Sequence, residues 1–515
     1  MASLAASLNM KPGSLRSKSL GARNYRASFA PVNGSSFKSL EQLKFQLPSV
    51  PRTYADLTTC VIRGKISSES GAATDVCFLE RNVYSIINRL EVSVANQQLD
   101  NIPNYNVLVH AMADIGAGVM NSGQYPHQAL LAGGDIACKA LGAPLARADA
   151  TGQTGTRSFA FPMPSLGIFG MGKLLPCDVA ENLTLTLHLE DYRSCLIHGS
   201  AVPTGYELTE LTLECNFVEL SAESEAALQG SLGSSPAVFD YEAVNSTSFT
   251  KQTGDLTLSQ NIGSRVSSLS RMLMIMRNSA SQQSATQLSL TNRSHANISE
   301  MQVKIGGVAF PQISIKNTTS NQADALVALQ MFEGDFGWQS LVGSLNQPAL
   351  FDYNVLDKLS TGASNAEIVT ALNSGLIGST AAANTNTKAA TVGNNTATTN
   401  THIRPEANAA KTKTNFARVS NFGIEDGVLA TATATGITRA TQQTDVGSFM
   451  LGLNLQVFLN NESLFNPVST IGQNVSVDLK FSAASTAAQV INVYSFYHQI
   501  VQLNPLTRMY EIAGQ

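Results

Sequence analysis

The stretch Leu183-Thr-Leu-Thr-Leu-His-Leu189 alternates large apolar side chains with polar ones at a period of two. Successive side chains of a β-strand point to opposite faces, so this pattern predicts a strand with one buried and one polar face. The same alternation recurs at 211–217 and at 475–481, and an aromatic-rich strand is expected at 491–503. Because both halves of the chain carry the signal, we expect one structural plan to be used twice.

A second pair of matching segments supports a duplication. Leu90-Glu-Val-Ser-Val94 precedes a polar turn and a helical stretch that includes Tyr105. Met301-Gln-Val-Lys-Ile305 precedes a two-glycine turn and a helical stretch around 326–332. Each half is therefore expected to run strand, turn, short helix, long excursion and alternating strand.

Length and composition limit the class of protein. The chain has 515 residues, enough for two to four domains of ordinary size. Charged residues make up 14%, below the roughly 25% of typical soluble proteins, which favours strands and polar loops over salt-bridged helices. The net charge of −4 argues against a strongly basic nucleic-acid-binding protein. No apolar run approaches the roughly 18 residues of a membrane-spanning helix.

Many short strands with turn-rich connections predict an all-β protein of two tandem eight-stranded antiparallel jelly rolls with short helices. Residues 360–445 are dominated by small, uncharged side chains, so we expect a long surface insertion in the second jelly roll, with a disordered linker as the alternative. The expected organisation is an N-terminal arm at 1–38, a first jelly roll at 39–221, a linker at 222–236, a second jelly roll at 237–505 and a tail at 506–515.

The start of the chain is basic. No acidic residue precedes Glu41, and the preceding cations are Lys11, Arg16, Lys18, Arg23, Arg26 and Lys38. A cationic, Ser-rich start is typical of an organelle transit peptide. It is equally typical of a flexible arm that contacts nucleic acid or another anionic surface. An inert tail is the third interpretation.

One segment has the spacing of a phosphate-binding loop. In Gly167-Ile-Phe-Gly-Met-Gly-Lys173, backbone N–H groups and an ammonium group are spaced as in loops that hold phosphates. However, Leu174 stands where Ser or Thr would bind Mg²⁺, and Pro176 falls where the phosphate-binding helix would start. We therefore predict a glycine-rich surface loop rather than a nucleotide site.

The cysteines and the sequons favour different compartments. The six cysteines are widely spaced without a CxxC pair, which predicts reduced and mostly buried thiols in an intracellular protein: Cys60, Cys77, Cys138, Cys177, Cys195 and Cys215. The nine NxS/T sequons are typical of a glycosylated, secreted chain, although an Asn- and Ser-rich sequence produces many by chance: Asn33, Asn182, Asn245, Asn292, Asn297, Asn317, Asn394, Asn461 and Asn474.

Motifs that would indicate catalysis or metal binding are missing from the sequence. The histidines follow no HExxH spacing, and His188 and His498 fall in strand patterns as face or interface residues. The adjacent acids Glu190 and Asp191 are expected in a solvated turn rather than as a hydrolytic pair. Trp338 is expected to be a core aromatic, or else a subunit-interface anchor. We predict no catalytic residues, no metal and no cofactor.

Several segments resemble one family. Those of the first half are Phe45–Pro48, the strand at 57–66, Tyr84–Val94, Asn96–Asn101 and the helix that opens at Tyr105. Together they resemble the first domain of double jelly-roll major capsid proteins of double-stranded DNA viruses, most of all those of Polinton-like viruses and virophages, in the adenovirus hexon-like lineage. In the second half, Val303–Pro311 and Phe449–Leu455 resemble the corresponding second domain. The likeness covers most of residues 40–505 and includes no catalytic motif.

The resemblance implies a homotrimer whose six sandwiches approximate a hexagon and tile an icosahedral virion shell, assembled inside an infected host cell. It implies neighbouring capsomers, penton proteins and minor capsid proteins as partners. The arm with Lys11, Arg16, Lys18, Arg23 and Arg26 would face inward, toward genome DNA or an inner membrane. A carbohydrate-binding or adhesin-like jelly-roll protein is the alternative function, and a jelly-roll hydrolase is a third class that would need two converging carboxylates.

Overall fold

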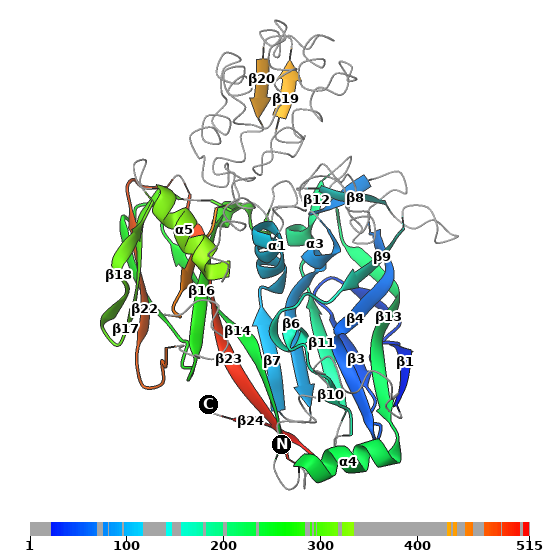
Figure 1. Cartoon of the computed structure of the whole chain (residues 1–515). Helices are drawn as coiled ribbons and strands as arrows, with labels where there is room; N and C mark the ends of the chain where they lie inside the picture. The colour runs from blue at the N-terminus through cyan, green and yellow to red at the C-terminus, as the bar shows by residue number, and fades with distance from the viewer. Residues whose placement is uncertain are drawn as a thin grey trace, which may run out of the picture.

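The chain folds into two β-sandwiches that lie side by side (Figure 1). A computed structural model describes residues 22–69, 76–80, 82–94, 97–116, 141–146, 156–178, 182–198, 203–232, 236–283, 289–290, 293–294, 296–317, 322–333, 430–433, 436–439, 449–456, 468–485, 487–504 and 508–513.

The first sandwich has two antiparallel sheets. One has the order β1 (Ala22–Phe29), β13 (Tyr206–Leu220), β4 (Thr53–Ser68) and β10 (Leu175–Pro176). The other has the order β3 (Gln42–Leu47), β11 (Leu183–Leu189), β6 (Ile87–Val94) and β7 (Gln97–Pro103).

The second sandwich repeats this arrangement. Its first sheet has the order β14 (Ala237–Lys251), β23 (Gln489–Leu503), β16 (Leu269–Asn278) and β21 (Leu451–Asn454). Its second sheet has the order β15 (Thr257–Ile262), β22 (Val475–Phe481), β17 (Ile298–Ile305) and β18 (Val308–Lys316).

The two sandwiches share one strand order. If these described strands are counted from one to eight along each half, both halves have a 1-8-3-6 sheet facing a 2-7-4-5 sheet. Eight strands wound this way are a jelly roll. The predicted all-β class and the predicted duplication of one sandwich plan are therefore confirmed.

Additional elements extend the sheets and connect them. The remaining strands are β2 (Ser36–Lys38), β5 (Val76–Glu80), β8 (Leu141–Ala146), β9 (Arg157–Pro162), β12 (Leu196–His198), β19 (Ala430–Thr433), β20 (Gly436–Arg439) and β24 (Tyr510–Ala513). The helices are η1 (Val83–Ile86), α1 (Tyr105–Gly116), η3 (Gly167–Gly170), α3 (Tyr192–Cys195), α4 (Ala222–Leu232), η4 (Ser279–Ser281) and α5 (Gln322–Glu333). Helices α1 and α5, which the two helical patterns predicted, each follow the fifth strand of their sandwich, and the expected order of strand, turn and helix did not include that strand. Among the described residues, no helix combines the length and apolarity needed to span a membrane.

Local sequence accounts for the elements that carry the repeat. All four leucines of β11 are buried, and the strand pairs with β3 on one side and β6 on the other. The β17–β18 hairpin closes through Gly306 and Gly307, whose φ angles are +58° and +86°. A two-residue hairpin turn of this kind needs positive φ at both positions, which glycine adopts without a Cβ clash.

Three of the segments expected outside the jelly rolls contain described elements. The arm expected at 1–38 includes β1 and β2. All of β1 pairs with residues 213–220 of β13, and β2 pairs with residues 207–209 of the same strand. Tyr25 of β1 stacks on Phe217 and Phe29 meets the same ring edge-to-face, so this part of the arm belongs to the first sandwich. The expected linker contains α4, and the expected tail contains β24, paired with β23. The insertion expected at 360–445 lies outside the described residues, except for the paired strands β19 and β20.

Candidate functional site

The surface where the two sandwiches meet, called the seam below, lies between β7, α1 and η3 of the first and β14, β23 and β24 of the second (Figure 1). At its centre the backbone carbonyl of Leu99, on β7, accepts hydrogen bonds from two side chains of the second sandwich. The Tyr241 hydroxyl is one donor, and the Gln499 amide, at 2.8 Å, is the other. An edge strand leaves backbone groups unpaired, and here the neighbouring sandwich satisfies one of them.

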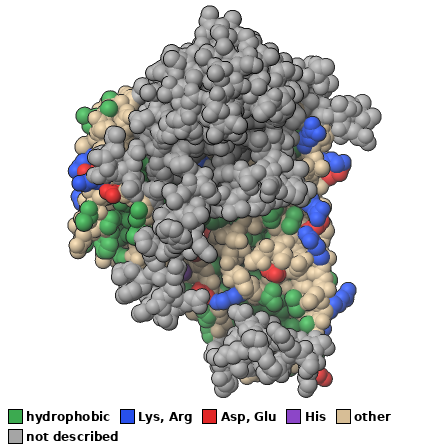
Figure 2. Space-filling model, turned by 45° about the horizontal axis from the view of Figure 1, so that its top comes forward, with side chains coloured by type: hydrophobic (Ala, Val, Ile, Leu, Met, Phe, Trp, Pro, Cys, Tyr) green, Lys and Arg blue, Asp and Glu red, His purple; other side chains and the backbone are tan. Residues whose placement is uncertain are grey.

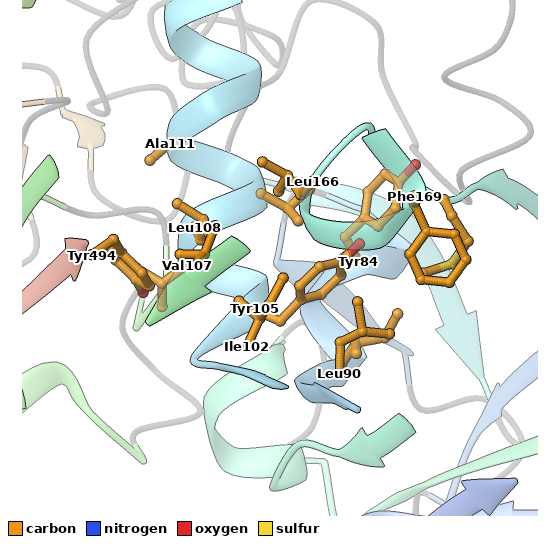
Figure 3. Packing of buried hydrophobic residues seen from close by; sticks show 14 of the residues in the cluster. Tyr84, Leu90, Ile102, Tyr105, Val107, Leu108, Ala111, Leu166, Phe169 and Tyr494 are labelled. Carbon is orange, nitrogen blue, oxygen red and sulfur yellow. The ribbon is translucent and has the colours of Figure 1, made fainter. Parts of the chain in front are cut away.

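Helix α1 sits at the upper part of the seam. Figure 3 shows Tyr494 of the second sandwich beside Val107 and Leu108 of α1. The Tyr494 hydroxyl donates to the Asn104 carbonyl at 2.9 Å, and the ring is fully buried. Burial raises the pKa of Tyr494, so the phenol stays protonated and remains a donor.

A buried carboxylate also crosses the seam. Glu80, at the end of β5, is 0% exposed, and its two oxygens accept the backbone N–H groups of Ser289 and Leu290 at 2.9 and 2.8 Å. These two residues belong to the second sandwich, in the segment that follows β16. Both amides are buried, so loss of the carboxylate would leave two donors unsatisfied.

The acidic pair expected in a solvated turn is buried instead. Glu190 accepts hydrogen bonds from the amides of Asn88 and Asn106 at 2.8 and 2.9 Å, and burial raises its pKa. Asp191 caps α3 by accepting the Arg193 N–H at 3.0 Å. The two carboxylates serve separate structural contacts, as expected for adjacent side chains that point apart, but the predicted solvent exposure is wrong.

Arg277 of β16 provides the opposite charge from the second sandwich. Its guanidinium donates to the Ser289 carbonyl at 2.8 Å and to the Asn492 side chain at 3.1 Å. Burial lowers its pKa, whereas the nearby charges of Glu190 and Glu80 raise it. The seam therefore contains acids of one sandwich within electrostatic reach of a cation of the other.

Carboxylates of the protein itself bind the glycine-rich segment at 167–173. The Ile168 N–H donates to Asp100 at 2.9 Å, and Lys173 pairs with Asp240 of the second sandwich. Gly167 has a φ of +60°, and a Cβ there would lie 1.7 Å from the Asp100 carboxylate. These contacts use the donors that a phosphate would need. Residues 167–169 are buried, which corrects the expected surface loop for that part of the segment.

The predicted basic arm is only partly described, because Lys11, Arg16 and Lys18 lie outside the described residues. Arg26 pairs with Glu214 at 2.8 Å, and the guanidinium of Arg23 lies 5.5 Å from the centre of the Tyr25 ring. Both arginines are therefore on the first sandwich. Figure 2 shows Lys and Arg side chains along the right edge, on the side of this sandwich.

The remaining candidate residues form no reactive group. Among the described cysteines all are free and buried, and Cys138 and Trp338 lie outside the described residues. His188 lies on β11 with its Nε2 3.3 Å from Glu91, and burial lowers the pKa of His498 on β23. Across the described ranges, no cluster of three His, Cys, Asp or Glu residues is arranged to hold a metal ion.

Sequence reasoning missed the charged residues of the seam. Their signal is a charged residue at the end of an apolar run, in Val76-Cys-Phe-Leu-Glu80 and in Met272-Leu-Met-Ile-Met-Arg277. It also missed β24, whose Tyr510 hydroxyl donates to the Pro176 carbonyl of the first sandwich at 2.6 Å. Nearby Arg508 pairs with Asp178 at 3.0 Å.

Comparisons with known proteins show a likeness in fold and none in sequence. No family model matches the sequence, and no curated protein matches it. The PBCV-1 virus capsid is structurally similar, with a TM-score of 0.51 at 9% identity over 98% of this chain and 99% of that chain. PBCV-1 VP54, as fitted into a reconstruction of the virophage Sputnik, gives a TM-score of 0.50 at 9% identity over the same shares. The fold is a double jelly roll. In this double jelly roll, the seam fixes the position of one sandwich relative to the other.

Proposed function

We propose that the chain is a major capsid protein that assembles as a homotrimer and tiles an icosahedral virion shell. Three copies supply six sandwiches, which approximate a hexagon. One polypeptide then covers a surface with repeated contacts, without an active site. The working location is the virion, after assembly inside the infected cell.

One observation carries the proposal. Two sandwiches with the same strand order are joined side by side through a seam of buried hydrogen bonds, so each chain presents two nearly equivalent tiles in a fixed relation. The likeness to the PBCV-1 capsid over nearly the full length of both chains supports the same assignment. The buried carboxylates Glu80, Asp100 and Glu190 are occupied by protein donors, which supports a structural rather than an enzymatic role.

The partners follow from the same proposal. Neighbouring capsomers, penton proteins and minor capsid proteins would complete the shell. In this proposal Lys11, Arg16 and Lys18 would contact the genome DNA, since Arg23 lies over the Tyr25 ring and Arg26 pairs with Glu214. If they contact DNA phosphates, removing all three should reduce the salt dependence of DNA binding by about one logarithmic slope unit per residue.

The mass of the purified full-length protein tests the proposal. We expect a particle of three times 54.6 kDa with a hexagonal outline by negative-stain imaging. A monomer at all concentrations would contradict the capsid role. Selective binding to a glycan array by such a monomer would instead support the carbohydrate-binding alternative.

A further inference from the structure

Two cysteines lie next to each other on β4 and β13, the two central strands of one sheet of the first sandwich (Figure 1). The antiparallel pairing of these strands runs in register as far as Val61, which is opposite Glu214. One further step in the same register brings Cys60 of β4 beside Cys215 of β13. Chain topology therefore places two thiols together that are far apart in the sequence.

Both thiols face the core. Each lies two residues from a member of the buried pair Ile62 and Leu213, and alternate residues of a strand share a face. Cys60 is 1% exposed and Cys215 is 0% exposed. A hydrogen bond with the Cys215 thiol, and then burial, raise the pKa of Cys60. The two sulfur atoms are therefore direct neighbours in a buried environment.

Strand β4 bulges at this point. The ladders that join β4 to β13, β9 and β10 skip residues 57–60, so Cys215 alone lies opposite this stretch. The Thr59 hydroxyl and the Cys215 thiol both donate to the Asp56 carbonyl, at 2.7 and 3.3 Å. Thr58, at the crest of the bulge, is exposed. Because a bulge interrupts the ladder, this stretch can open locally without unfolding the sheet.

We propose that Cys60 and Cys215 form a disulfide bond when the folded protein meets a small neutral oxidant, hydrogen peroxide. Directly opposed residues of an antiparallel pair have Cβ atoms about 4.5 to 5.5 Å apart, and a disulfide needs about 3.5 to 4.5 Å. A movement of about 1 Å in the bulge closes that difference. A small oxidant suits thiols that are reached only by local opening.

The reaction consumes two thiols and one peroxide, and it yields one disulfide and two waters. One cysteine, as its thiolate, attacks a peroxide oxygen; the O–O bond breaks, and the departing hydroxide takes up the thiol proton as the first water. The second thiol attacks the sulfenic sulfur that results; the S–S bond forms, the S–O bond breaks, and the second water leaves. The sulfurs are oxidised and the peroxide oxygens are reduced. Since the thiolate is the reactive form, the raised pKa of Cys60 makes the first step slow.

The bond would fasten the two central strands where their ladder is interrupted. It would close the chain from residue 60 to residue 215, a loop that contains most strands of the first sandwich. Closing a long loop restricts the unfolded chain and so stabilises the folded one. The pairing of the thiols does not depend on the capsid role, but its use rests on the proposed function. A shell assembled in a reducing cell would gain the bond after release into an oxidising medium.

Oxidation of the purified full-length protein tests the inference. After treatment with hydrogen peroxide and alkylation of free thiols, digestion without reductant should give linked peptides that contain Cys60 and Cys215. The thermal midpoint should rise by about 10 °C and fall again after reduction. Cys215→Ser should abolish the rise, whereas Cys195→Ser, at another fully buried thiol, should retain it. Each variant is compared with its own reduced form, and the wild-type peptide map decides if a variant fails to fold.

The competing partner is Cys177, the third thiol in this part of the core. Burial, and then the neighbouring Cys215, raise its pKa. A link between Cys177 and Cys215, or sulfinic acids at both cysteines without a link, would overturn the inference. Wild-type trimers whose thiols stay unlinked would overturn it while leaving the capsid role intact. A monomer that forms the link between Cys60 and Cys215 would remove the capsid role and support the inference.

Discussion

Strands β7 and β18 have the same place in the same fold, yet one is buried and the other is exposed. On β7, Asp100 is 3% exposed and lies between the two sandwiches, whereas Ile313 on β18 is the most exposed large apolar residue described. Position within a jelly roll therefore does not decide burial; the adjacent sandwich does. The comparison indicates that the chain carries one covered copy and one uncovered copy of the same edge.

The largest expected effect comes from deleting the strand at the far end of the molecule. Removal of residues 1–30 takes away β1 and the aromatic contacts of Tyr25 and Phe29 with Phe217. The free energy of unfolding should fall by about 4 kcal/mol, since the two partly buried aromatic side chains and the buried Phe217 ring that they cover lose about 1 to 2 kcal/mol each. Urea denaturation followed by circular dichroism measures it. Removal of residues 1–21 is the control and should leave stability unchanged; equal losses would show that β1 contributes little.

The second largest loss of stability should come from the seam, at Glu80. Glu80→Ala leaves the amides of Ser289 and Leu290 without their acceptor, which should cost about 3 kcal/mol. The thermal midpoint of the purified protein measures the loss. Glu69→Ala, at an exposed carboxylate paired with Lys38, is the control. A midpoint as high as that of the control would mean that the seam does not depend on Glu80.

The pH dependence of stability tests the burial of Asp100 at the covered edge, β7. Burial raises the pKa of Asp100 to about 7 from its ordinary value of 3.8, although N–H donors from Ile168 and Asn101 oppose the shift. Between these values the unfolded chain has released its proton while the folded chain keeps it, so stability falls as pH rises through this window. Asp100→Asn should make the thermal midpoint less dependent on pH between pH 4 and 7. An unchanged slope would show that Asp100 is ionised throughout.

The smallest effect is expected at the basic face of the first sandwich. Arg26→Ala should lower stability by about 0.5 kcal/mol, because the pair with Glu214 is half exposed and Arg63 also contacts that carboxylate at 3.0 Å. Chemical denaturation of Arg26→Ala, Arg63→Ala and the double variant measures both pairs. A loss as large as that of Glu80→Ala would contradict a surface role for Arg26.

Much of the fold was predictable from local sequence. The alternation at 183–189 indicated which side chains are buried, and the paired segments at 90–94 and 301–305 indicated the duplication. The strand order was not predictable, because a period of two defines the faces of a strand and not its partners. The ladder of β14 with β23, for example, joins Ala237 to Leu503 at the far end of the chain.

The seam was harder to predict for a related reason. Glu80 and Arg277 are each a charged residue that follows an apolar run, a signal that suits a strand end in solvent as well as a buried contact. Both contact backbone groups around Ser289, which carry no sequence signature and lie 209 residues from Glu80. The strand that carries Arg23 and Arg26 was not predicted, because cationic residues on an edge strand have the composition of a free arm.

The ladder between β14 and β23 also sets an order of events during synthesis. The first sandwich has all its strands once Leu220 has left the ribosome, whereas β23, which covers β7, is made only at 489–503. At ordinary elongation rates this interval lasts on the order of tens of seconds. We expect protease to cut ribosome-bound chains near β7 during that time, and protection there would refute the order. Until translation nears its end, each nascent chain exposes the edge of β7 as well as the edge of β18. Chaperone binding at β7 would prevent nascent chains on the same mRNA from associating prematurely.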